Sequence, residues 1–366
     1  MDTTPHPKPS TQTQTQTPTQ PPTPPTPPKT PKKTTISSQT KYEYERYKTT
    51  TDNLKKTLEK YGVAIIPNVI NQEECDNMTS GMWDYIEHIT QRFTIPIKRD
   101  NTASWKEFRK LYPLHSMLLQ RYGIGQAQYI WDLRQNRKIT SIFAKLWNCE
   151  ENDLLVSFDG ASIHFPPEKT KSNSGWFQGN NWLHTDQSYT KTNFECVQSW
   201  ITGFDVNEGD ATLTFLEGSH KYHAEFATQF KVEDKTDWYK LENDEQYKFY
   251  MQTKDCPRKS IKCPVGSMVF WDSRTIHMGQ EPLSTREKDN FRNVAYLCYV
   301  PRHFATEANL KKKIKAFEEL RTTSHYPHKG KLFPVNPRTY GGDIPDVELI
   351  IKPTINDLGR RLVGYE

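Results

Sequence analysis

The stretch NWLHTDQSY, residues 181–189, places a histidine and an aspartate two positions apart, at His184 and Asp186. Alternate residues of a β-strand point to the same face, so the two side chains can converge on one point. An imidazole and a carboxylate with this spacing are either a pair of metal ligands or a polar strand end. The same spacing recurs at His223 and Glu225, so the pair alone is not specific. A metal site needs a third ligand from elsewhere in the chain.

His277 is the candidate for that third ligand. It ends the segment VGSMVFWDSRTIH, in which a turn at residues 265–267 leads into an apolar strand. Two histidines and one carboxylate on one face of an octahedron leave three open positions, an arrangement suited to ferrous iron and oxygen chemistry. The alternative is that His277 only forms a hydrogen bond at the rim of the sheet.

Such a site also needs a buried cation, because a keto acid bound to iron carries a second carboxylate at its far end. Arginine offers a planar pair of donors for a carboxylate. Arg292 begins the next apolar strand, FRNVAYLCYV, and is the preferred candidate. Arg286 lies in the polar segment STREKDN, which is typical of a solvated loop. Arg274 falls on the opposite strand face from His277, so we expect a structural role for it.

The elements that must position these side chains are short. Residues 151–302 contain β-rich runs separated by Gly, Asn and Asp turns, a pattern that predicts an antiparallel sandwich or jelly roll. Residues 221–258 are rich in charged and aromatic residues and indicate a helical insertion between strands. This insertion is a candidate cap for the entrance to the site.

The flanking regions are predicted to be mostly helical. Residues 42–62 read as a helix that ends at Gly62, followed by a buried strand over residues 63–70. Asn71 and Glu74 have the spacing of a capping box at the start of another helix. Further helices are expected within residues 105–150, and one in ANLKKKIKAFEELR, before coil continues to residue 366.

The N-terminal residues 1–40 are rich in Pro, Thr and Gln and are predicted to be a disordered tail, because this composition cannot bury a core. A passive spacer is the favoured interpretation, and a proline-recognition module is a candidate partner. The formal net charge is +5, but this tail alone carries four lysines against one aspartate. The remainder is close to neutral, so the charge gives no support for nucleic-acid binding.

Cysteine use and hydropathy bear on location. The six cysteines are scattered without a CxxC pair, which indicates reduced thiols. The sequence shows neither an apolar secretory leader nor a run of eighteen apolar residues. From these features we expect an intracellular, cytoplasmic protein without a membrane span.

Taken together, these segments resemble the phytanoyl-CoA dioxygenase family of Fe(II)- and 2-oxoglutarate-dependent oxygenases. The matching pieces occur in the family's order over residues 60–302: YGVAIIPNVINQEEC, HTD, WITGFDVNEGDATLTFLEGSH, VFWDSRTIH and FRNVAYLCYVP. The resemblance implies a double-stranded β-helix, a cupin-like jelly roll, with helices packed outside. It also implies one oxygenase domain over residues 41–366, with a helical part at 41–150, the core at 151–302 and an extension at 303–366.

The resemblance further implies that His184, Asp186 and His277 bind iron and that Arg292 anchors 2-oxoglutarate. Gln198 is a candidate contact to 2-oxoglutarate, with an ordinary strand amide as the alternative. The implied reaction is hydroxylation of a small molecule, or of a protein side chain, by molecular oxygen, with release of succinate and carbon dioxide. Related halogenases replace the carboxylate with a small residue, so Asp186 favours hydroxylation.

Two features depart from the family's pattern. The spacing between His277 and Arg292 is longer than the family's usual one, which leaves Arg286 as an alternative anchor. The segment LEGSH, residues 216–220, replaces the more common PGSH.

Other functions compete with this interpretation. A zinc-dependent hydrolase could use His220, His223 and Glu225 if that stretch were helical, although the sequence contains no HExxH. A non-catalytic jelly-roll binding module is the second alternative, and the intact His/Asp/His/Arg set argues against it.

Two further sets of residues have either a ligand contact or a structural role, and the sequence does not choose between them. They are the loop residues Trp176, Phe177, Asn180, Asn181 and Trp182, and the lysines of KKKIK at 311–315.

Overall fold

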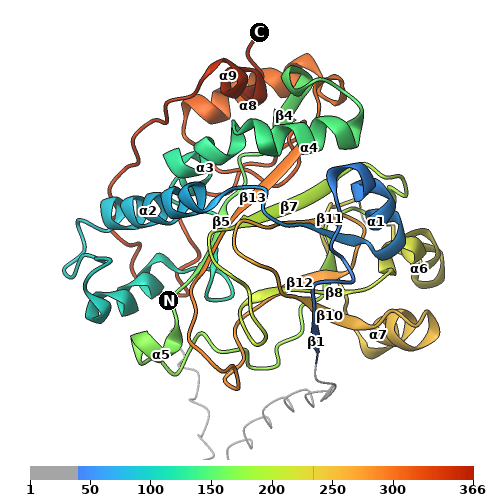
Figure 1. The fold of residues 1–366 in the computed structure, drawn as a ribbon, viewed down its shortest axis with the longest axis horizontal. Helices are drawn as coiled ribbons and strands as arrows, with labels where there is room; N and C mark the ends of the chain where they lie inside the picture. The colour runs from blue at the N-terminus through green and yellow to red at the C-terminus, as the bar shows by residue number, and fades with distance from the viewer. Residues whose placement is uncertain (1–39, 234) are drawn as a thin grey trace, which may run out of the picture. The chain divides into compact units, whose positions relative to one another are not determined.

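The computed structural model describes residues 40–233 and 235–366, which are built around two β-sheets with helices outside them (Figure 1). The predicted tail over residues 1–40 and its proposed partner therefore lie outside the described residues, apart from residue 40. All strand pairs are antiparallel except β1 with β10. The predicted jelly-roll core is confirmed.

The first sheet has six strands. Its order is β1 (Lys41–Glu43), β10 (Arg258–Ile261), β8 (Thr212–Leu216), β12 (His277–Gln280), β6 (His184–Thr185) and β9 (Tyr239–Lys240). The second sheet has seven strands. Its order is β2 (Val63–Ile66), β11 (Met268–Asp272), β7 (Val197–Thr202), β13 (Arg292–Pro301), β5 (Ala161–His164) and β3 (Leu118–Leu119), with β4 (Leu154–Val156) paired to the far end of β13.

The second sheet is covered on both faces, which explains its continuous apolar strands. In β11, Met268 and Phe270 pack with the helices, whereas Val269 and Trp271 face the core between the two sheets. Helices α2 (Gln72–Ile89), α3 (Gln128–Arg134) and α4 (Arg137–Trp147) lie over the outer face (Figure 1). A strand buried on both sides has no polar face, so its sequence does not alternate.

The predicted helix over residues 42–62 is only partly right. Helix α1 covers Leu54–Tyr61 and ends at Gly62, whose φ of 80° is left-handed as a helix C-cap requires. The preceding residues instead form β1 and a segment in which Tyr47 is fully buried. The Ile65 backbone N–H donates to the Tyr47 carbonyl, and the Ile65 carbonyl accepts from the Thr49 N–H, both at 2.8 Å. Pairing with distant strands overrides the helical propensity of this segment.

The capping box at α2 is confirmed. The Asn71 side chain accepts a hydrogen bond from the Glu74 backbone at 2.9 Å, and the Glu74 carboxylate accepts one from the Asn71 backbone at 2.7 Å. We expect Asn71→Ala to lower the free energy of unfolding by about 1 kcal/mol, because it leaves a helix N–H without its partner. Urea unfolding followed by circular dichroism measures this, with Asn71→Asp expected to retain most of the stability. Equal stability of Asn71→Ala and the parent would contradict the role of the cap.

The remaining helical predictions have mixed outcomes. The insertion at 221–258 contains α6 (His223–Phe230), α7 (Asp244–Lys248) and a π-helix at Phe249–Thr253, as expected. Residues Thr102–Leu111 form a 3-10 helix rather than an α-helix, and α5 (Pro167–Thr170) is a single turn. In the extension, α8 (Glu307–Glu318) is confirmed, but α9 (Asp357–Val363) is missed because seven residues give little periodicity.

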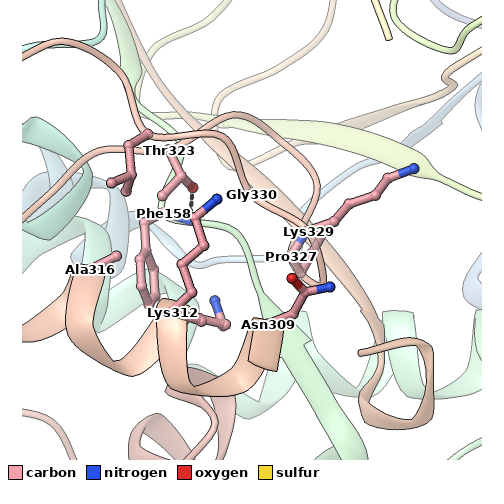
Figure 2. A pocket seen from close by; sticks show the side chains of 10 residues that line it. Phe158, Asn309, Lys312, Ala316, Thr323, Pro327, Lys329 and Gly330 are labelled. Atoms are coloured by element: carbon pink, nitrogen blue, oxygen red, sulfur yellow. Dashed lines mark hydrogen bonds between the residues drawn. The ribbon is translucent and has the colours of Figure 1, made fainter. Parts of the chain in front are cut away.

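The lysines of KKKIK do not all lie on a solvated helix face. Lys313 is buried, with its ammonium hydrogen-bonded to the Val156 carbonyl and 3.7 Å from the centre of the Phe158 ring. The hollow beside it, between α8 and the following coil, has a volume of about 20 Å³ (Figure 2). That space is the size of a water molecule, so it is not a substrate site.

The cysteines and the helices bear on the expectations about thiols and membrane spans. All six cysteines are described and none forms a disulfide, as predicted. Within the described residues, none of the helices has the length and apolar character needed to cross a bilayer.

Candidate metal centre

Three side chains predicted from the sequence meet at one point. His184 on β6 pairs directly with His277 on the neighbouring strand β12, and Asp186 follows β6 by one residue. The Asp186 carboxylate oxygens lie 3.5 Å from His184 Nε2 and 3.3 Å from His277 Nε2. In the described part of the chain, this is the one group of three or more His, Cys, Asp or Glu whose ligand atoms lie within 4.8 Å of one another.

The tautomers of both histidines suit metal binding. The Nδ1 atom of His184 lies 3.1 Å from the Trp182 carbonyl, and Nδ1 of His277 lies 2.9 Å from the Thr275 carbonyl. A carbonyl oxygen only accepts, so each Nδ1 carries the proton and each Nε2 keeps a free lone pair. Both lone pairs point toward the Asp186 carboxylate, which is the orientation that a shared cation requires.

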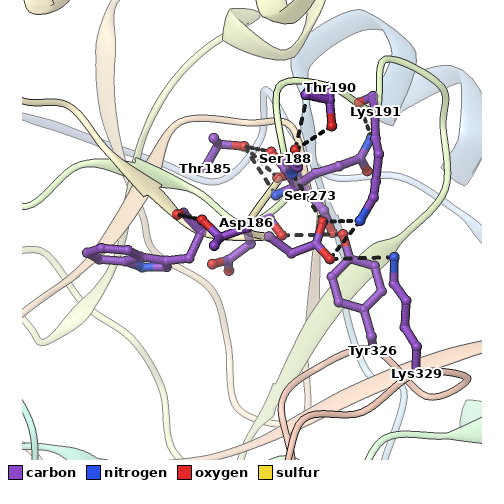
Figure 3. Close-up of polar contacts among 12 residues, drawn as sticks. Thr185, Asp186, Ser188, Thr190, Lys191, Ser273, Tyr326 and Lys329 are labelled. Carbon is purple, nitrogen blue, oxygen red and sulfur yellow. Dashed lines mark hydrogen bonds and ion pairs between the residues drawn. The ribbon is translucent and has the colours of Figure 1, made fainter. Parts of the chain in front are cut away.

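Asp186 is held from three directions. Its side chain accepts a hydrogen bond from Gln198 Nε2 at 2.9 Å, and its backbone N–H donates to the Ser273 carbonyl at 3.1 Å. The Tyr326 hydroxyl donates to the Asp186 carbonyl at 3.3 Å (Figure 3). Burial alone would raise the pKa of this carboxyl, but in the absence of a metal the positive charge of protonated His184 and N–H donation from Nε2 of His184 and His277 outweigh it and hold the pKa well below its usual range. The carboxylate is therefore ionised and ready to bind a cation.

The triad lies in a cavity of about 610 Å³. The buried end of this cavity is formed by Asp159, Gln198, Trp200, Trp271, Arg292 and Tyr296. Towards the exposed end the walls are largely apolar or basic and include Leu114, Met117, Leu118, Trp182, Trp238, Phe333, Lys235, Lys329 and Lys331. A cavity of this size accommodates 2-oxoglutarate together with a second small molecule.

Arg292 lies in this cavity and Arg286 does not. The Arg292 guanidinium is 4% exposed and donates to Ser162 Oγ and the Ala211 carbonyl, both at 2.9 Å. Across residues 40–233 and 235–366, no carboxylate lies within 4.0 Å of it, the ion-pairing distance. A buried guanidinium without a counter-ion is costly, so a bound anion would stabilise it.

Arg286, the alternative anchor, is already paired. Its guanidinium contacts Glu168 at 2.7 Å and Asp210 at 3.1 Å, and neither of those carboxylates borders the cavity. Arg274, predicted to be structural, forms an ion pair with Asp272 at 2.6 Å and donates to the Thr192 carbonyl. Of the three arginines considered, only Arg292 is available to a ligand in the cavity.

Gln198 is brought to the site, but its amide group is used by the protein. It donates to Asp186 at 2.9 Å and lies 3.4 Å from Ser273 Oγ. The structure thus gives this side chain an orienting contact to the triad. A contact to 2-oxoglutarate remains a prediction.

The residues of the zinc-hydrolase alternative do not converge. His220 Nε2 lies 3.1 Å from the Glu59 carbonyl, and His223 Nε2 lies 3.0 Å from the Ser188 carbonyl. Glu225 is exposed and pairs with Lys254. The second His-x-carboxylate motif is therefore structural, because a backbone carbonyl occupies Nε2 of its histidine, as another does for the nearby His220.

Of the aromatic residues in the loop before HTD, only Trp182 borders the cavity. The Trp176 ring instead lies 5.5 Å from the Arg286 guanidinium. Phe177 packs in the same hydrophobic cluster as Trp182 but does not border the cavity. The insertion contributes Lys235, Thr236, Asp237 and Trp238 to the exposed end of the cavity.

Several cavity residues were missed by the sequence analysis. His325 and Tyr326 come from the coil after α8, and Thr323 of that coil pairs with Phe158 through its backbone and hydroxyl groups. The segment SHYPH, with two histidines and a tyrosine in a Pro- and Gly-rich region, was the available signal. Asp159 lies in the turn before β5. The sequence around it did not indicate a role in the site, because it shows only a single acidic residue in an apolar run.

Asp159 has an unusual environment. It is 8% exposed, and its Oδ1 accepts a hydrogen bond from the Gly160 backbone at 2.7 Å. Burial raises the pKa of its carboxyl to about 7, with a further contribution from the nearby Asp186 charge. The folded protein therefore retains a proton between about pH 4 and pH 7 that the unfolded chain has lost.

This pKa predicts a pH-dependent effect of Asp159→Asn in the metal-free protein. The stability of the parent falls as pH rises from about 4 to about 7 and then levels off, because the folded state must give up that proton. The neutral amide removes this loss, so the variant should gain stability relative to the parent over that range, by at most about 4 kcal/mol. Urea unfolding at pH 4, 6 and 8 in EDTA measures the difference. A difference that does not change with pH would contradict the raised pKa.

The sequence around this site matches a known protein family. The sequence profile of the phytanoyl-CoA dioxygenase family matches residues 58–289, more than half of the chain. The chain belongs to the phytanoyl-CoA dioxygenase family. The match contains His184, Asp186 and His277, and it ends three residues before Arg292.

Two curated relatives and a solved structure are similar to the chain. "Ava biosynthesis cluster protein O" of Aspergillus versicolor is 28% identical over 57% of this chain and 66% of its own length. "Putative phytanoyl-CoA dioxygenase" of Dictyostelium discoideum is 26% identical over 36% of this chain and 35% of its own length. The match thus spans less than two thirds of each relative. The structure of "Putative Oxidoreductase" from Salmonella typhimurium LT2 shares the fold, with a TM-score of 0.53 and 15% identity over 86% and 82% of the chains.

Iron and 2-oxoglutarate are the cofactors of this phytanoyl-CoA dioxygenase family member. Its donor set fits iron, because ligands of one ion at about 2.1 Å lie about 3 Å apart when adjacent, close to the separations found here. Two imidazoles and one carboxylate are also the donor types of non-heme Fe(II) oxygenases.

Proposed function

We propose that this protein is a 2-oxoglutarate-dependent dioxygenase that hydroxylates a small molecule in the 610 Å³ cavity. In this proposal His184, Asp186 and His277 bind the iron. The observation that carries it is the placement, in one cavity, of this triad and of Arg292, a buried cation with no carboxylate of the described residues within ion-pairing distance. The triad offers three donors on one side, and the arginine offers a partner for a distal carboxylate.

The residues have distinct roles in this reaction. When bound, iron and 2-oxoglutarate activate molecular oxygen for oxidation of the substrate and release succinate and carbon dioxide. His184 and His277 bind through Nε2, with their protonated Nδ1 atoms fixed by backbone carbonyls. Gln198 orients the Asp186 carboxylate, and Arg292 holds the far carboxylate of 2-oxoglutarate with its planar fork of donors. Trp200 and Trp271, both buried, exclude water from this end.

Two observations favour hydroxylation of a small molecule. The carboxylate of Asp186 fills the ligand position that a halide would need, so halogenation is disfavoured. The iron site lies at the buried end of a cavity whose mouth is narrowed by Trp182, Trp238 and the coil around His325, which suits a small molecule better than a side chain on a folded protein. The Aspergillus versicolor relative is named for a biosynthesis cluster, which supports the same substrate class.

Anaerobic titration of the purified protein with Fe(II) and 2-oxoglutarate tests this function. We expect a weak visible charge-transfer band, followed in air by succinate release that rises with the correct substrate. Candidate metabolites and peptides in one panel separate the two substrate classes. The proposal fails if the band is absent and His184→Ala behaves like the parent.

A further inference from the structure

Three aromatic rings are stacked behind the metal centre. The His115 and Trp182 rings are nearly parallel, with an interplanar angle of 8° and centroids 3.9 Å apart. The Trp182 and His184 rings are also parallel within 11°, with centroids 4.9 Å apart. The indole of Trp182 thus lies between a loop histidine and a triad histidine. Residues 182 and 184 share a face because they are two positions apart in an extended segment.

The backbone that carries His115 is strained. His115 and Ser116 have φ values of 48° and 59°, in the left-handed region that residues other than glycine rarely adopt. The loop is closed by hydrogen bonds between the backbones of Leu114 and Leu118, and the Met117 carbonyl accepts from Ile163 of β5 at 2.8 Å. Such a conformation persists only where the surroundings over-determine it. Here it places the imidazole flat against the indole.

The space that the edge of the Trp182 indole occupies depends on a glycine in β12. A Cβ atom added to Gly279 would lie 2.8 Å from Met117 Cε and 3.6 Å from Trp182 Cζ2. Gly279 is two residues after His277 on β12, so both face the same side of the strand. The missing side chain leaves the room that the indole edge and Met117 occupy.

The stacked indole restricts tilting of the His184 ring, which the hydrogen bond at Nδ1 does not prevent. The Nδ1 atom of His184 is fixed by the Trp182 carbonyl at 3.1 Å, but the ring can still tilt about that contact. A parallel indole on one face of the ring resists this tilt, and His115 supports the indole from behind. The nearby Trp238 offers no such constraint, because its ring is tilted by 36° to that of His184, 5.7 Å away, and is 51% exposed.

We propose that Trp182 and His115 are positioning residues that hold the plane of the His184 ring so that Nε2 faces the iron. This rests on the proposed function, since it takes His184 as an iron ligand. Trp182 thereby acts on the metal centre and not as a substrate clamp. Partners that orient a metal ligand commonly change metal affinity by about 10- to 100-fold when they are removed.

The experiment measures metal binding without a substrate. Co(II) affinity is determined by visible absorption, and the charge-transfer band of Fe(II) with 2-oxoglutarate is recorded anaerobically. We expect Trp182→Ala to weaken Co(II) binding by about 10- to 100-fold and to shift or broaden the Fe(II) band. Trp182→Phe should restore most of both signals, because a planar ring remains against His184. His115→Ala should produce a smaller change in the same direction.

Trp176→Ala is the matched control, because its indole lies against Arg286 and does not border the cavity, and it should leave both signals as in the parent. Thermal unfolding of each metal-free variant separates a local change from a loss of folding. If Trp182→Ala does not fold, the test rests on His115→Ala, since His115 is an exposed loop residue whose replacement is compatible with folding. Parental metal affinity and band in the folded Trp182 and His115 variants, or an equal change in Trp176→Ala, would overturn the positioning role. A parent protein without the band would instead refute the proposed function.

Discussion

Replacing Asp186 by alanine is expected to weaken iron binding strongly and to abolish 2-oxoglutarate turnover. The carboxylate is the only anionic donor of the triad, and two neutral imidazoles hold a divalent cation weakly on their own. We expect Fe(II) affinity to fall by more than about 100-fold, which is more than the loss typical for residues that only orient a metal ligand. Anaerobic titration and succinate release in the absence of substrate give two independent measurements. Asp186→Asn, which keeps the shape but loses the charge, should be nearly as defective.

The second His-x-carboxylate motif provides a matched control for this substitution. Glu225→Ala removes a carboxylate with the same spacing from a histidine, but that carboxylate is exposed and pairs with Lys254. We expect parental Fe(II) affinity and turnover in this variant. Retention of iron binding in Asp186→Ala, or its loss in Glu225→Ala, would place the metal elsewhere.

Replacing Arg292 by methionine is expected to weaken 2-oxoglutarate binding by about 100-fold, as the loss of charge-assisted hydrogen bonds worth about 3 kcal/mol predicts. The guanidinium is buried in the cavity and has no carboxylate partner among the residues described, so a ligand carboxylate completes its pairing. Arg292→Lys keeps the charge but loses the planar fork, and we expect an intermediate affinity. Titration of the charge-transfer band with 2-oxoglutarate measures each dissociation constant, while Co(II) binding should stay unchanged.

Arg286→Met distinguishes the two candidate anchors. This substitution breaks ion pairs with Glu168 and Asp210, so it should lower the melting temperature while leaving 2-oxoglutarate affinity at the parental value. The assignment of Arg292 would be wrong if Arg286→Met lost 2-oxoglutarate binding and Arg292→Met kept it.

The sequence by itself determined the features that depend on neighbours along the chain. The capping box of Asn71 and Glu74 and the helix end at Gly62 follow from local backbone chemistry, and both are present. The apolar strand before His277 and the shared face of His184 and Asp186 follow from strand periodicity. The family resemblance also came from the sequence alone. It rested on the order of the short motifs along the chain, because an ordered set of motifs is more specific than any one of them.

The tertiary structure alone decided which of these residues meet. His184 and His277 are neighbours because β6 pairs with β12, and nothing local distinguishes HTD from HAE until that pairing is known. Arg286 is excluded by Glu168, which lies 118 positions away in the sequence. His115 reaches the indole of Trp182 through a strained loop that no propensity favours. Contacts between distant segments form when apolar surfaces are buried together, and a linear pattern of residue types does not specify their partners.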